Sequence, residues 1–419
     1  MRIALVLEQF DARKGGLEQW TARFAEGLDE RGHEVHAVTR RFVPHCTQAP
    51  VVLHRVEAGK TPVAFAEAAQ AKLMELAPDV IHDMGCGWYC DVFHPHGGSW
   101  AAVTRRKQDM LPGWLRQVKR RVDKLLPRHR RFASLLAGQY ADRGQLMIAL
   151  SQTVAEDFQR FHGVPEERIR VIYNGVDVER FTPANQARWR ASVRRHLGIG
   201  EDAVLALIVA HNFRLKGVPT LLRAMRRLRS GPRPVHLAVV GGKRFARWRL
   251  EATGLGVGRR VHFVGTADDT APYYAAADLY VHPTIYDACS LVVLEAAASG
   301  LPVVTSRVNG VADLLTHGAD SLLLERPTDV AGLSGAMRLL LDDARRAELA
   351  AAARRTALRH TLRRNVEEVL AVYDEVLAMR GSTARSAIAG NPATRRAAAR
   401  NHADSSPRAQ RPERAPATP

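Results

Sequence analysis

Short apolar runs that alternate with helical stretches, in two successive series, constrain the fold of this chain more than any other feature. The first series starts with the apolar run 3–7, followed by a glycine-rich loop, a helical pattern over 17–29 and another apolar run at 34–39. The second series starts at 204–209 and repeats the alternation. Strands separated by helices predict parallel sheets covered by helices on both faces. We therefore expect an α/β protein with two tandem, Rossmann-like, doubly wound domains.

The length of 419 residues agrees with more than one domain, at roughly 150 residues per domain. The first domain is expected to cover residues 1–183 and the second to cover 184–360. A helix over 361–380 closes the folded part. The remainder, 381–419, is rich in Ala, Ser, Pro and Arg without an apolar period, which predicts a disordered basic tail.

The sequence gives no sign of export or of a membrane span. No apolar run approaches the roughly 20 residues that cross a bilayer, and Met1 leads into only a short apolar run. The four cysteines are too sparse for a disulfide framework and lack zinc-site spacing, so we interpret them as reduced thiols. We expect a cytoplasmic protein.

Positive charge is concentrated in one segment of the chain. The formal net charge is +18, and the segment 104–131 alone holds eleven Lys and Arg against two Asp. Apolar residues recur there at helical spacing, which predicts a basic amphipathic helix. These apolar residues are Trp114, Leu115, Val118, Val122, Leu125 and Leu126.

Two interpretations of the segment 104–131 remain open from the sequence. The helix can lie on an anionic leaflet, where each cation adds about 1 kcal/mol, which would place the protein at the inner face of the cytoplasmic membrane. Alternatively, it packs on its own domain and leaves a solvated basic face. Specific nucleic-acid binding is disfavoured, because no recognised motif accompanies the charge.

Two loops that follow predicted strands carry groups suited to an anion. Gly15 and Gly16 precede a helix, so backbone N–H groups and the helix dipole can face an anion, although a plain turn has the same pattern. Arg214 and Lys216 follow the strand 204–209 and can neutralise a diphosphate; the alternative is two solvated surface bases. Ligands of doubly wound sheets bind beyond the carboxyl ends of the strands, which predicts a site in the cleft between the domains.

The stretch 286–302 is the most informative in the chain. Asp287 and Glu295 flank the start of a predicted helix, where Ser290 and Leu291 would offer free backbone N–H groups to a phosphate. Asp287 can then hold hydroxyls of a sugar, and Glu295 hydroxyls of a ribose. The alternative is that Asp287 only caps the helix and Glu295 is solvated.

These motifs resemble those of a known family. Asp287-x7-Glu295 is similar to the E-x7-E region of the retaining GT-B glycosyltransferases of family 4, and 171–177 is similar to the N-G-V-D segment of that family. The similarity covers most of residues 1–375, with the other motifs in the family's order. Within the family, the chain is most similar to lipopolysaccharide core glucosyltransferases that extend the inner-core heptose.

The resemblance implies roles for the residues of the second domain. Glu295 would bind the ribose of a nucleotide diphosphate sugar, and Arg214 and Lys216 its diphosphate. Asp287 stands where the family usually has Glu, so its side chain is one methylene shorter and its contact with the sugar is left open.

The first domain would face the donor from the other side of the cleft. The resemblance implies that Gly15 and Gly16 contact the phosphates and that His96 lies near the donor sugar. His94 is equally close to the end of its strand, so the sequence leaves the choice between these two histidines open.

The resemblance also implies the reaction. A hexose, glucose foremost, would pass from UDP-glucose or another nucleotide diphosphate sugar to a saccharide of the lipopolysaccharide core or a related cell-surface glycan, which can be lipid-linked. Stabilising the departing diphosphate is the main catalytic task. We expect neither a metal nor a cofactor, and same-face attack by the acceptor hydroxyl.

Three alternatives compete with this hypothesis. Sugar-nucleotide 2-epimerases also use paired doubly wound domains, and they would change the donor without an acceptor. Another family 4 enzyme, such as a mannosyltransferase, would use a different donor. A nonenzymatic basic scaffold would bind nucleic acid or membrane in a salt-sensitive manner.

Overall fold

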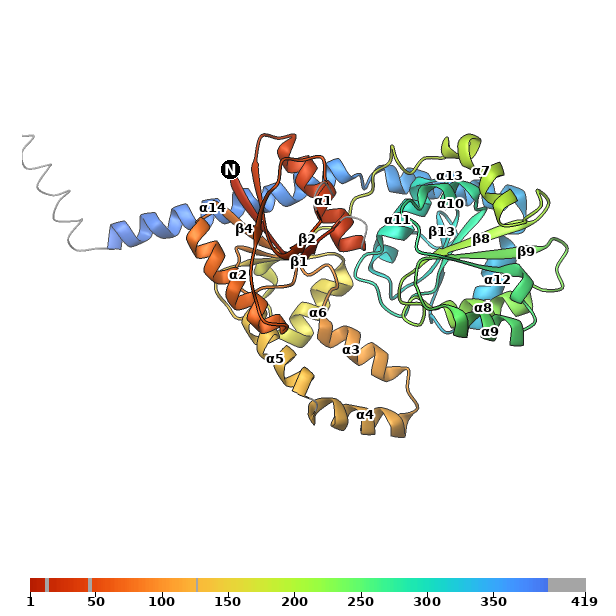
Figure 1. Ribbon diagram of the computed structural model, residues 1–419, viewed down its shortest axis with the longest axis horizontal. Coiled ribbons are helices and arrows are strands. Elements are labelled where there is room, and N and C mark those ends of the chain that lie inside the picture. Colours follow the sequence, from red (N-terminus) through yellow and green to blue (C-terminus); the bar gives the residue numbers. More distant parts are fainter. Residues whose placement is uncertain (12–14, 44–46, 126, 391–419) are drawn as a thin grey trace, which may run out of the picture. The chain divides into compact units, whose positions relative to one another are not determined.

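Two parallel β-sheets form the framework of the chain (Figure 1). The computed structural model describes residues 1–11, 15–43, 47–125 and 127–390. Residues 1–373 form one compact unit, which holds both sheets, and residues 374–419 form a second unit. The expected α/β architecture with two doubly wound sheets is confirmed.

The first sheet has seven strands in the order β3-β2-β1-β4-β5-β6-β7, and all its pairings are parallel. The short outer strands β3 and β7 were not predicted, because neither has a long apolar run. The strands are β1 (Arg2–Phe10), β2 (Glu34–Phe42), β3 (Val52–Arg55), β4 (Val80–Asp83), β5 (Val92–Phe93), β6 (Leu146–Ala149) and β7 (Ile169–Val171).

The second sheet has six parallel strands in the order β10-β9-β8-β11-β12-β13. Its central strand β8 is buried at all six positions, as expected for a strand covered on both faces. The strands are β8 (Val204–Val209), β9 (Val235–Val240), β10 (Val261–Gly265), β11 (Leu279–His282), β12 (Val303–Ser306) and β13 (Ser321–Leu324).

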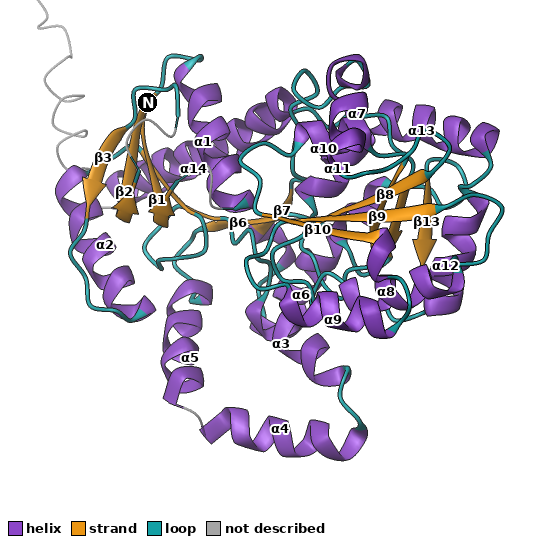
Figure 2. Ribbon diagram, turned by 45° about the vertical axis from the view of Figure 1, so that its right-hand side comes forward, coloured by secondary structure: helices purple, strands orange, loops and turns teal. Residues whose placement is uncertain are grey.

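Helices cover both faces of the second sheet (Figure 2). Helices α7 (Asn185–His196), α10 (Ala271–Ala276) and α13 (Asp343–Leu358) lie on one face, and α8 (Val218–Arg227), α9 (Ala246–Gly254) and α12 (Val330–Leu339) on the other. The first sheet packs against α1 (Gly16–Asp29), α2 (Pro62–Leu76) and α6 (Gln152–His162), among others. Among the described residues, no helix combines the length and apolar character required to cross a bilayer.

The prediction of one helix over 104–131 is wrong. The segment is divided among α3 (Trp100–Asp109), α4 (Gly113–Leu125) and α5 (Pro127–Tyr140). Pro112 explains the break between α3 and α4, because proline disfavours helical backbone in the residue before it and cannot donate the next helical hydrogen bond. Pro127 instead occupies the first position of α5, where proline is favoured.

The apolar side chains of α4 that the structure describes are exposed rather than packed on the domain. The exposed fractions are 70% for Trp114, 37% for Leu115, 53% for Val118 and 47% for Val122. This finding contradicts the alternative of a helix packed on its domain. Two of the predicted apolar residues and six of the predicted basic residues lie outside the described side chains: Leu125, Leu126, Arg120, Arg121, Lys124, Arg128, Arg130 and Arg131.

The C-terminal helix is longer than predicted. Helix α14 begins at Leu362, one residue after the predicted start, and continues to Gly390, beyond the predicted end at residue 380. The Ala-rich composition of this stretch is compatible with helix, which explains why the interpretation as a disordered tail is wrong up to Gly390. The rest of the predicted tail, 391–419, lies outside the described residues.

The start of α14 is seated on a loop that leaves the first sheet. The N–H of Val176 donates to the carbonyl of His360 at 2.9 Å, and the N–H of Leu362 donates to the carbonyl of Val176 at 3.0 Å. Gly175 fits beneath this contact because it has no side chain. A Cβ at this position would lie 2.6 Å from the Thr361 carbonyl oxygen and 2.7 Å from Cα of Leu362.

We predict that Gly175→Ala lowers the stability of the chain. The added methyl group meets backbone atoms that cannot move aside, and such overpacking costs about 1–3 kcal/mol. Gly335→Ala is the matched control, because Gly335 lies within α12 in open space that an added methyl group can occupy, so alanine should stabilise by about 0.5–1 kcal/mol. Thermal unfolding of the two variants measures both effects, and an unchanged Tm for Gly175→Ala would contradict the first.

Candidate functional site

Four loops that follow strands bring the predicted site residues together. Gly16 follows β1, His96 follows β5, Lys216 follows β8 and Asp287 follows β11. Each of these strands is in a parallel sheet, so within each sheet the loops leave from the same edge. The parallel topology therefore gathers residues that are far apart in the sequence.

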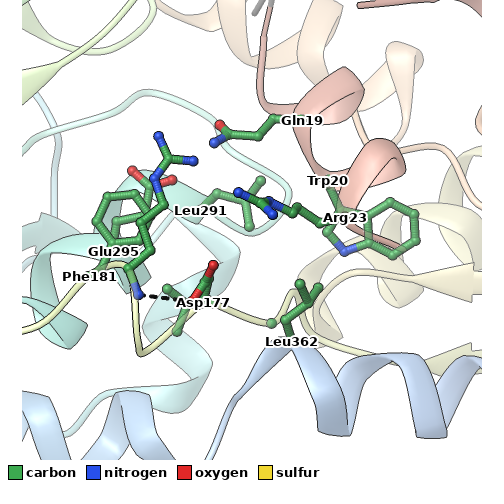
Figure 3. Close-up of a pocket in the computed structure, with 11 residues that line it drawn as sticks. Gln19, Trp20, Arg23, Asp177, Phe181, Leu291, Glu295 and Leu362 are labelled. Atoms are coloured by element: carbon green, nitrogen blue, oxygen red, sulfur yellow. Dashed lines mark hydrogen bonds between the residues drawn. The ribbon is translucent and has the colours of Figure 1, made fainter. Parts of the chain in front are cut away.

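A pocket lies between helix α1, the loop 175–181 and the segment 291–295 (Figure 3). Its empty volume is about 390 Å³ when the open space at its mouth is included. Figure 3 shows Gln19 and Arg23 reaching from α1 towards Leu291 and Glu295, which lie on helix α11 (Leu291–Ala298). The lining residues are Gln19, Trp20, Arg23, Gly175, Val176, Asp177, Arg180, Phe181, Leu291, Glu295 and Leu362.

The first turns of two helices meet beside this pocket. Helix α1 begins at Gly16 and helix α11 at Leu291, and a Cβ on Gly16 would lie 3.5 Å from Cδ1 of Leu291. Each helix leaves N–H groups of its first turn without partners inside the helix, and each dipole favours negative charge there. The arrangement of Gly16 and Leu291 is therefore suited to an anion, as the sequence predicted.

Ser290 occupies the N-cap of α11 without capping it through its side chain. Its hydroxyl is buried and has no hydrogen-bond partner in the described part of the chain. A buried hydroxyl without a partner is costly, so the group is available to a polar ligand.

Asp287 does not cap α11, so that alternative is wrong. Its carboxylate instead forms an ion pair with Lys216, and Nε2 of His282 lies 3.6 Å from Oδ2. Burial alone would raise the pKa of Asp287, but the charge of Lys216 and contact with His282 hold the pKa well below its usual range. The loops after β8 and β11 are thus joined by a charged pair of two predicted site residues.

The backbone beside Lys216 requires glycine. Gly217 has φ of +79°, and a Cβ there would lie 2.0 Å from the carbonyl oxygen of Pro283. This close approach places Lys216 next to the loop that carries Asp287.

Glu295 is buried rather than solvated, so that alternative is wrong too. Its side chain lines the pocket and accepts a hydrogen bond of 2.9 Å from the Tyr274 hydroxyl. Burial raises the pKa of Glu295 to about 7, against the lowering effects of Tyr274 and Arg180. The carboxyl group therefore changes charge near neutral pH.

Three histidines form a cluster at the ends of β4 and β5. Nε2 of His82 and Nδ1 of His94 are 3.1 Å apart, and the rings of His94 and His96 lie 4.2 Å apart. Burial lowers the pKa of His82 and of His96 to about 3, so both rings are neutral at pH 7. The ring of His96 also lies 4.4 Å from that of Trp20, which lines the pocket.

The histidine cluster bears on the choice between His94 and His96. His94 is completely buried and uses one nitrogen towards His82, whereas His96 is partly exposed. Nε2 has no hydrogen-bond partner among the described residues in either His94 or His96, so the difference lies in exposure and in the His82 contact. These contacts favour His96 as the residue that can meet a ligand.

Arg214 is one predicted site residue that the structure does not bring into these contacts. Its side chain is exposed, on the same loop as Lys216. Its assignment to a diphosphate stays a prediction.

Sequence reasoning missed several residues of the site. Gln19, Trp20 and Arg23 follow Gly16 at helical spacing, so the sequence could have predicted that they lie on one helix face beside the Gly16 loop. Tyr274 and His282 could not be found in this way, because Tyr274 contacts Glu295 and His282 contacts Asp287 only through the packing of separate segments. Within the described residues, no three His, Cys, Asp or Glu side chains assemble as a candidate metal centre.

Tyr286 connects the two halves of the site. It precedes Asp287, is 3% exposed, and its hydroxyl would lie 2.1 Å from a Cβ on Gly98. The guanidinium of Arg106 lies 5.2 Å from the centre of the Tyr286 ring. Gly98 is only two residues after His96, so this contact sets the His96 loop against the Asp287 loop.

Comparison with known proteins gives matches along both halves of the chain. Residues 14–180 match the model of the family described as Glycosyltransferase Family 4, and 204–343 match that of Glycosyl transferases group 1. The D-inositol 3-phosphate glycosyltransferase of Geodermatophilus obscurus is 30% identical over 409 residues, covering 90% of this chain and 88% of the relative. That of Acidothermus cellulolyticus is 29% identical, with 90% and 89% covered.

A solved structure supports the architecture. WaaG, a glycosyltransferase involved in lipopolysaccharide biosynthesis, is similar with a TM-score of 0.76 and 26% identity, covering 89% of this chain and 99% of that one. The two sheets of this chain accordingly form the GT-B fold, which confirms the predicted fold class.

We predict that Glu295→Gln stabilises the ligand-free chain at high pH. Because the pKa of Glu295 is raised from 4.5 to about 7, folding favours the protonated carboxyl, so its contribution falls as pH rises through this window. At pH 8 the difference is on the order of 3 kcal/mol, and below pH 4.5 it disappears. Thermal unfolding from pH 5 to 8 measures this, with Glu201→Gln at an exposed position as control. Parallel profiles for Glu295→Gln and the unchanged chain would contradict the prediction.

Proposed function

Because the chain belongs to glycosyltransferase family 4, and is therefore a transferase, we propose that it moves a hexose, glucose foremost, from UDP-glucose to a saccharide acceptor. The observation that carries the proposal is the meeting of the first turns of α1 and α11 at Gly16 and Leu291, beside the pocket that holds Glu295. This arrangement matches the chemistry of a nucleotide diphosphate, which has two phosphates and a ribose.

The donor diphosphate lies at the two helix starts in this proposal. Free N–H groups of α1 and α11 face its oxygens, and the Ser290 hydroxyl donates to one of them. Lys216 approaches from the loop after β8 and exchanges part of its contact with Asp287 for the diphosphate. Arg214, on the same loop and exposed, adds a forked cation.

The ribose hydroxyls donate to the carboxylate of Glu295. This contact requires the ionised form of the carboxyl, and the pKa of about 7 makes donor affinity dependent on pH. The Tyr274 hydroxyl orients the carboxylate by its hydrogen bond of 2.9 Å to Oε2.

The donor sugar lies between Asp287 and His96. The carboxylate of Asp287 accepts hydrogen bonds from sugar hydroxyls, and the neutral imidazole of His96 can donate or accept one. Tyr286 holds the two loops in contact through Gly98. The side chain of Asp287 is one methylene shorter than the usual Glu, and its carboxylate is paired with Lys216.

We propose transfer with retention of configuration and without a metal ion. The bond between the sugar carbon and the phosphate oxygen breaks while negative charge grows on the diphosphate. Helix starts and Lys216 stabilise that charge in place of a metal ion. The departing phosphate accepts the proton of the acceptor hydroxyl, which attacks the same face of the sugar.

The proposed acceptor is a sugar of the lipopolysaccharide core or of a related cell-surface glycan attached to a membrane. Its support is the exposed apolar face of α4, where Trp114 is 70% exposed on the same helix as the half-exposed Arg116 and the exposed Lys119. A helix with such faces binds at the interface of an anionic leaflet. The protein would thus work at the inner face of the cytoplasmic membrane.

We predict that Glu295→Gln weakens donor binding by about tenfold at pH 8, the loss of one charged hydrogen bond of about 1.5–3 kcal/mol. Donor affinity of the unchanged chain should fall from pH 8 to 6, whereas that of the variant should be flat. A thermal-shift panel of UDP, GDP and ADP sugars measures the affinities and identifies the base.

Lys216→Ala should lower kcat more than donor affinity, with Lys60→Ala at an exposed position as control.

Product analysis separates the alternatives. Incubation with the preferred donor alone should give slow hydrolysis, and epimerised donor would overturn the proposal in favour of an isomerase. A membrane lipid fraction should accept the sugar. Transfer to inositol 3-phosphate instead would support the transferase activity but refute the proposed acceptor. Full turnover by Glu295→Gln would refute its assignment, and loss of activity with EDTA would refute metal independence.

We predict that Trp114→Ser combined with Val118→Ser lowers binding to vesicles that contain anionic phospholipid, because both side chains would enter the headgroup region. Sedimentation with vesicles measures the bound fraction, which should fall about tenfold or more for two large apolar groups. Met74→Ser, at a residue of α2 that is 63% exposed, is the control. Equal binding by all three proteins would remove α4 from the membrane contact.

A further inference from the structure

A second basic surface lies on the helices that follow β8 and β9, away from α4. Between Arg223 and Arg260 the chain has eleven Lys and Arg and a single acidic residue, Glu251. Nine of the eleven bases are exposed: Arg223, Arg226, Arg227, Arg229, Lys243, Arg244, Arg247, Arg249 and Arg259. We call these nine the α8–α9 surface.

The fold places the five of these cations that belong to α8 and α9 on one side of the second sheet. Helices α8 and α9 lie together on the same face of that sheet in both views (Figures 1 and 2). Arg223, Arg226 and Arg227 have the i, i+3, i+4 spacing of one helix face, and the opposite face of α8 is buried. The cations therefore point away from the core of the domain.

The described residues leave this charge without carboxylates to balance it. Arg233 pairs with Asp343 at 2.7 Å, but it is not among the nine. No ion pair joins any of the nine to a carboxylate within the described ranges. Cations so close together repel one another, and an anionic partner relieves that repulsion.

We infer that the α8–α9 surface docks on the headgroups of an anionic phospholipid bilayer. The surface offers guanidinium groups, which bind phosphate through two parallel hydrogen bonds. It also offers Leu250, which is 75% exposed next to Arg249 on α9 and can enter the headgroup region.

The aromatic residues of this surface favour a bilayer over a nucleic acid. Single-stranded nucleic acids need aromatic faces on which bases stack. The guanidinium of Arg249 lies 4.6 Å from the centre of the Phe245 ring, and that of Arg247 lies 5.0 Å from the Trp248 ring. Trp248 is only 9% exposed, and the ring of Phe245 stacks on that of Phe263, so neither ring offers a free pair of faces to bases.

The inference differs from the proposed function, because it requires no contact of α4 and no particular donor or acceptor. It adds a membrane contact on the half of the chain that contains the second sheet to the membrane contact proposed for α4. Both contacts weaken with salt, because the Debye length falls from about 10 Å at 0.1 M to about 3 Å at 1 M.

The test neutralises three of the nine cations in the full chain, as Arg223→Gln, Arg226→Gln and Arg247→Gln. The control neutralises three exposed arginines on the opposite face of the sheet, as Arg188→Gln, Arg195→Gln and Arg355→Gln on α7 and α13. Each protein is sedimented at 0.1 M salt with vesicles of phosphatidylcholine alone or with one third phosphatidylglycerol. A thermal unfolding scan confirms that both triple variants are folded.

We expect the α8–α9 triple variant to lose about tenfold or more of its affinity for the anionic vesicles, since each cation at the surface adds about 1 kcal/mol. The control should lose less than about twofold, and neutral vesicles should bind all proteins weakly. Equal losses for the two triple variants would overturn the inference, because they would show a response to net charge alone. An unchanged α8–α9 variant would overturn it too.

Two further measurements distinguish the inference from a membrane contact through α4 alone and from nucleic-acid binding. If Trp114→Ser with Val118→Ser abolishes vesicle binding while the α8–α9 triple variant binds normally, α4 is the membrane contact and the inference is overturned while the proposed function stands. If the unchanged chain binds single-stranded RNA more tightly than anionic vesicles, and the α8–α9 triple variant loses that binding, the surface recognises nucleic acid and the inference is overturned.

Discussion

Parallel pairing of all strands in the two sheets is the constraint on which the site depends. It sends the loops after the strands of each sheet to one edge, and those loops carry Gly16, His96, Lys216 and Asp287. None of these residues would form a site on its own loop. Their proximity comes from the topology, which also explains why the contacts join residues as distant as Gly16 and Leu291.

The electrostatics of the site follow from burial and from the partners that burial provides. Asp287 stays charged because Lys216 lies against it, whereas Glu295, which has a hydroxyl as its direct partner, titrates near neutral pH. His96 is neutral for the same physical reason, since burial lowers its pKa and no anion offsets that effect. The site thus contains a permanent charge pair, a titratable carboxyl and neutral rings, which is suited to a ligand that has both phosphates and hydroxyls.

The distribution of exposed apolar and cationic residues distinguishes this chain from an ordinary two-domain enzyme. Burial of Trp114 and Val118 would have stabilised the isolated domain, yet both are exposed on α4. Such exposure is unfavourable in water and is compensated when a partner covers the residues. The same argument, with charge in place of apolar area, applies to the cations on α8 and α9.

Local patterns in the amino-acid sequence were enough to predict most elements and the positions of the motifs, because apolar periodicity and helix spacing depend on neighbouring residues alone. Asp287 and Glu295 were identified in this way, and so were the long strands of both sheets. Pro112 also signals a break within 104–131, and the predicted apolar residues all follow it. The partners of these residues could not be predicted: the pairing of Lys216 with Asp287, the hydrogen bond from Tyr274 to Glu295 and the exposure of α4 join or separate elements far apart in the chain. Such contacts depend on how the elements pack in three dimensions. The tertiary structure therefore determined the partners of Asp287 and Glu295, and through burial and those partners their charge.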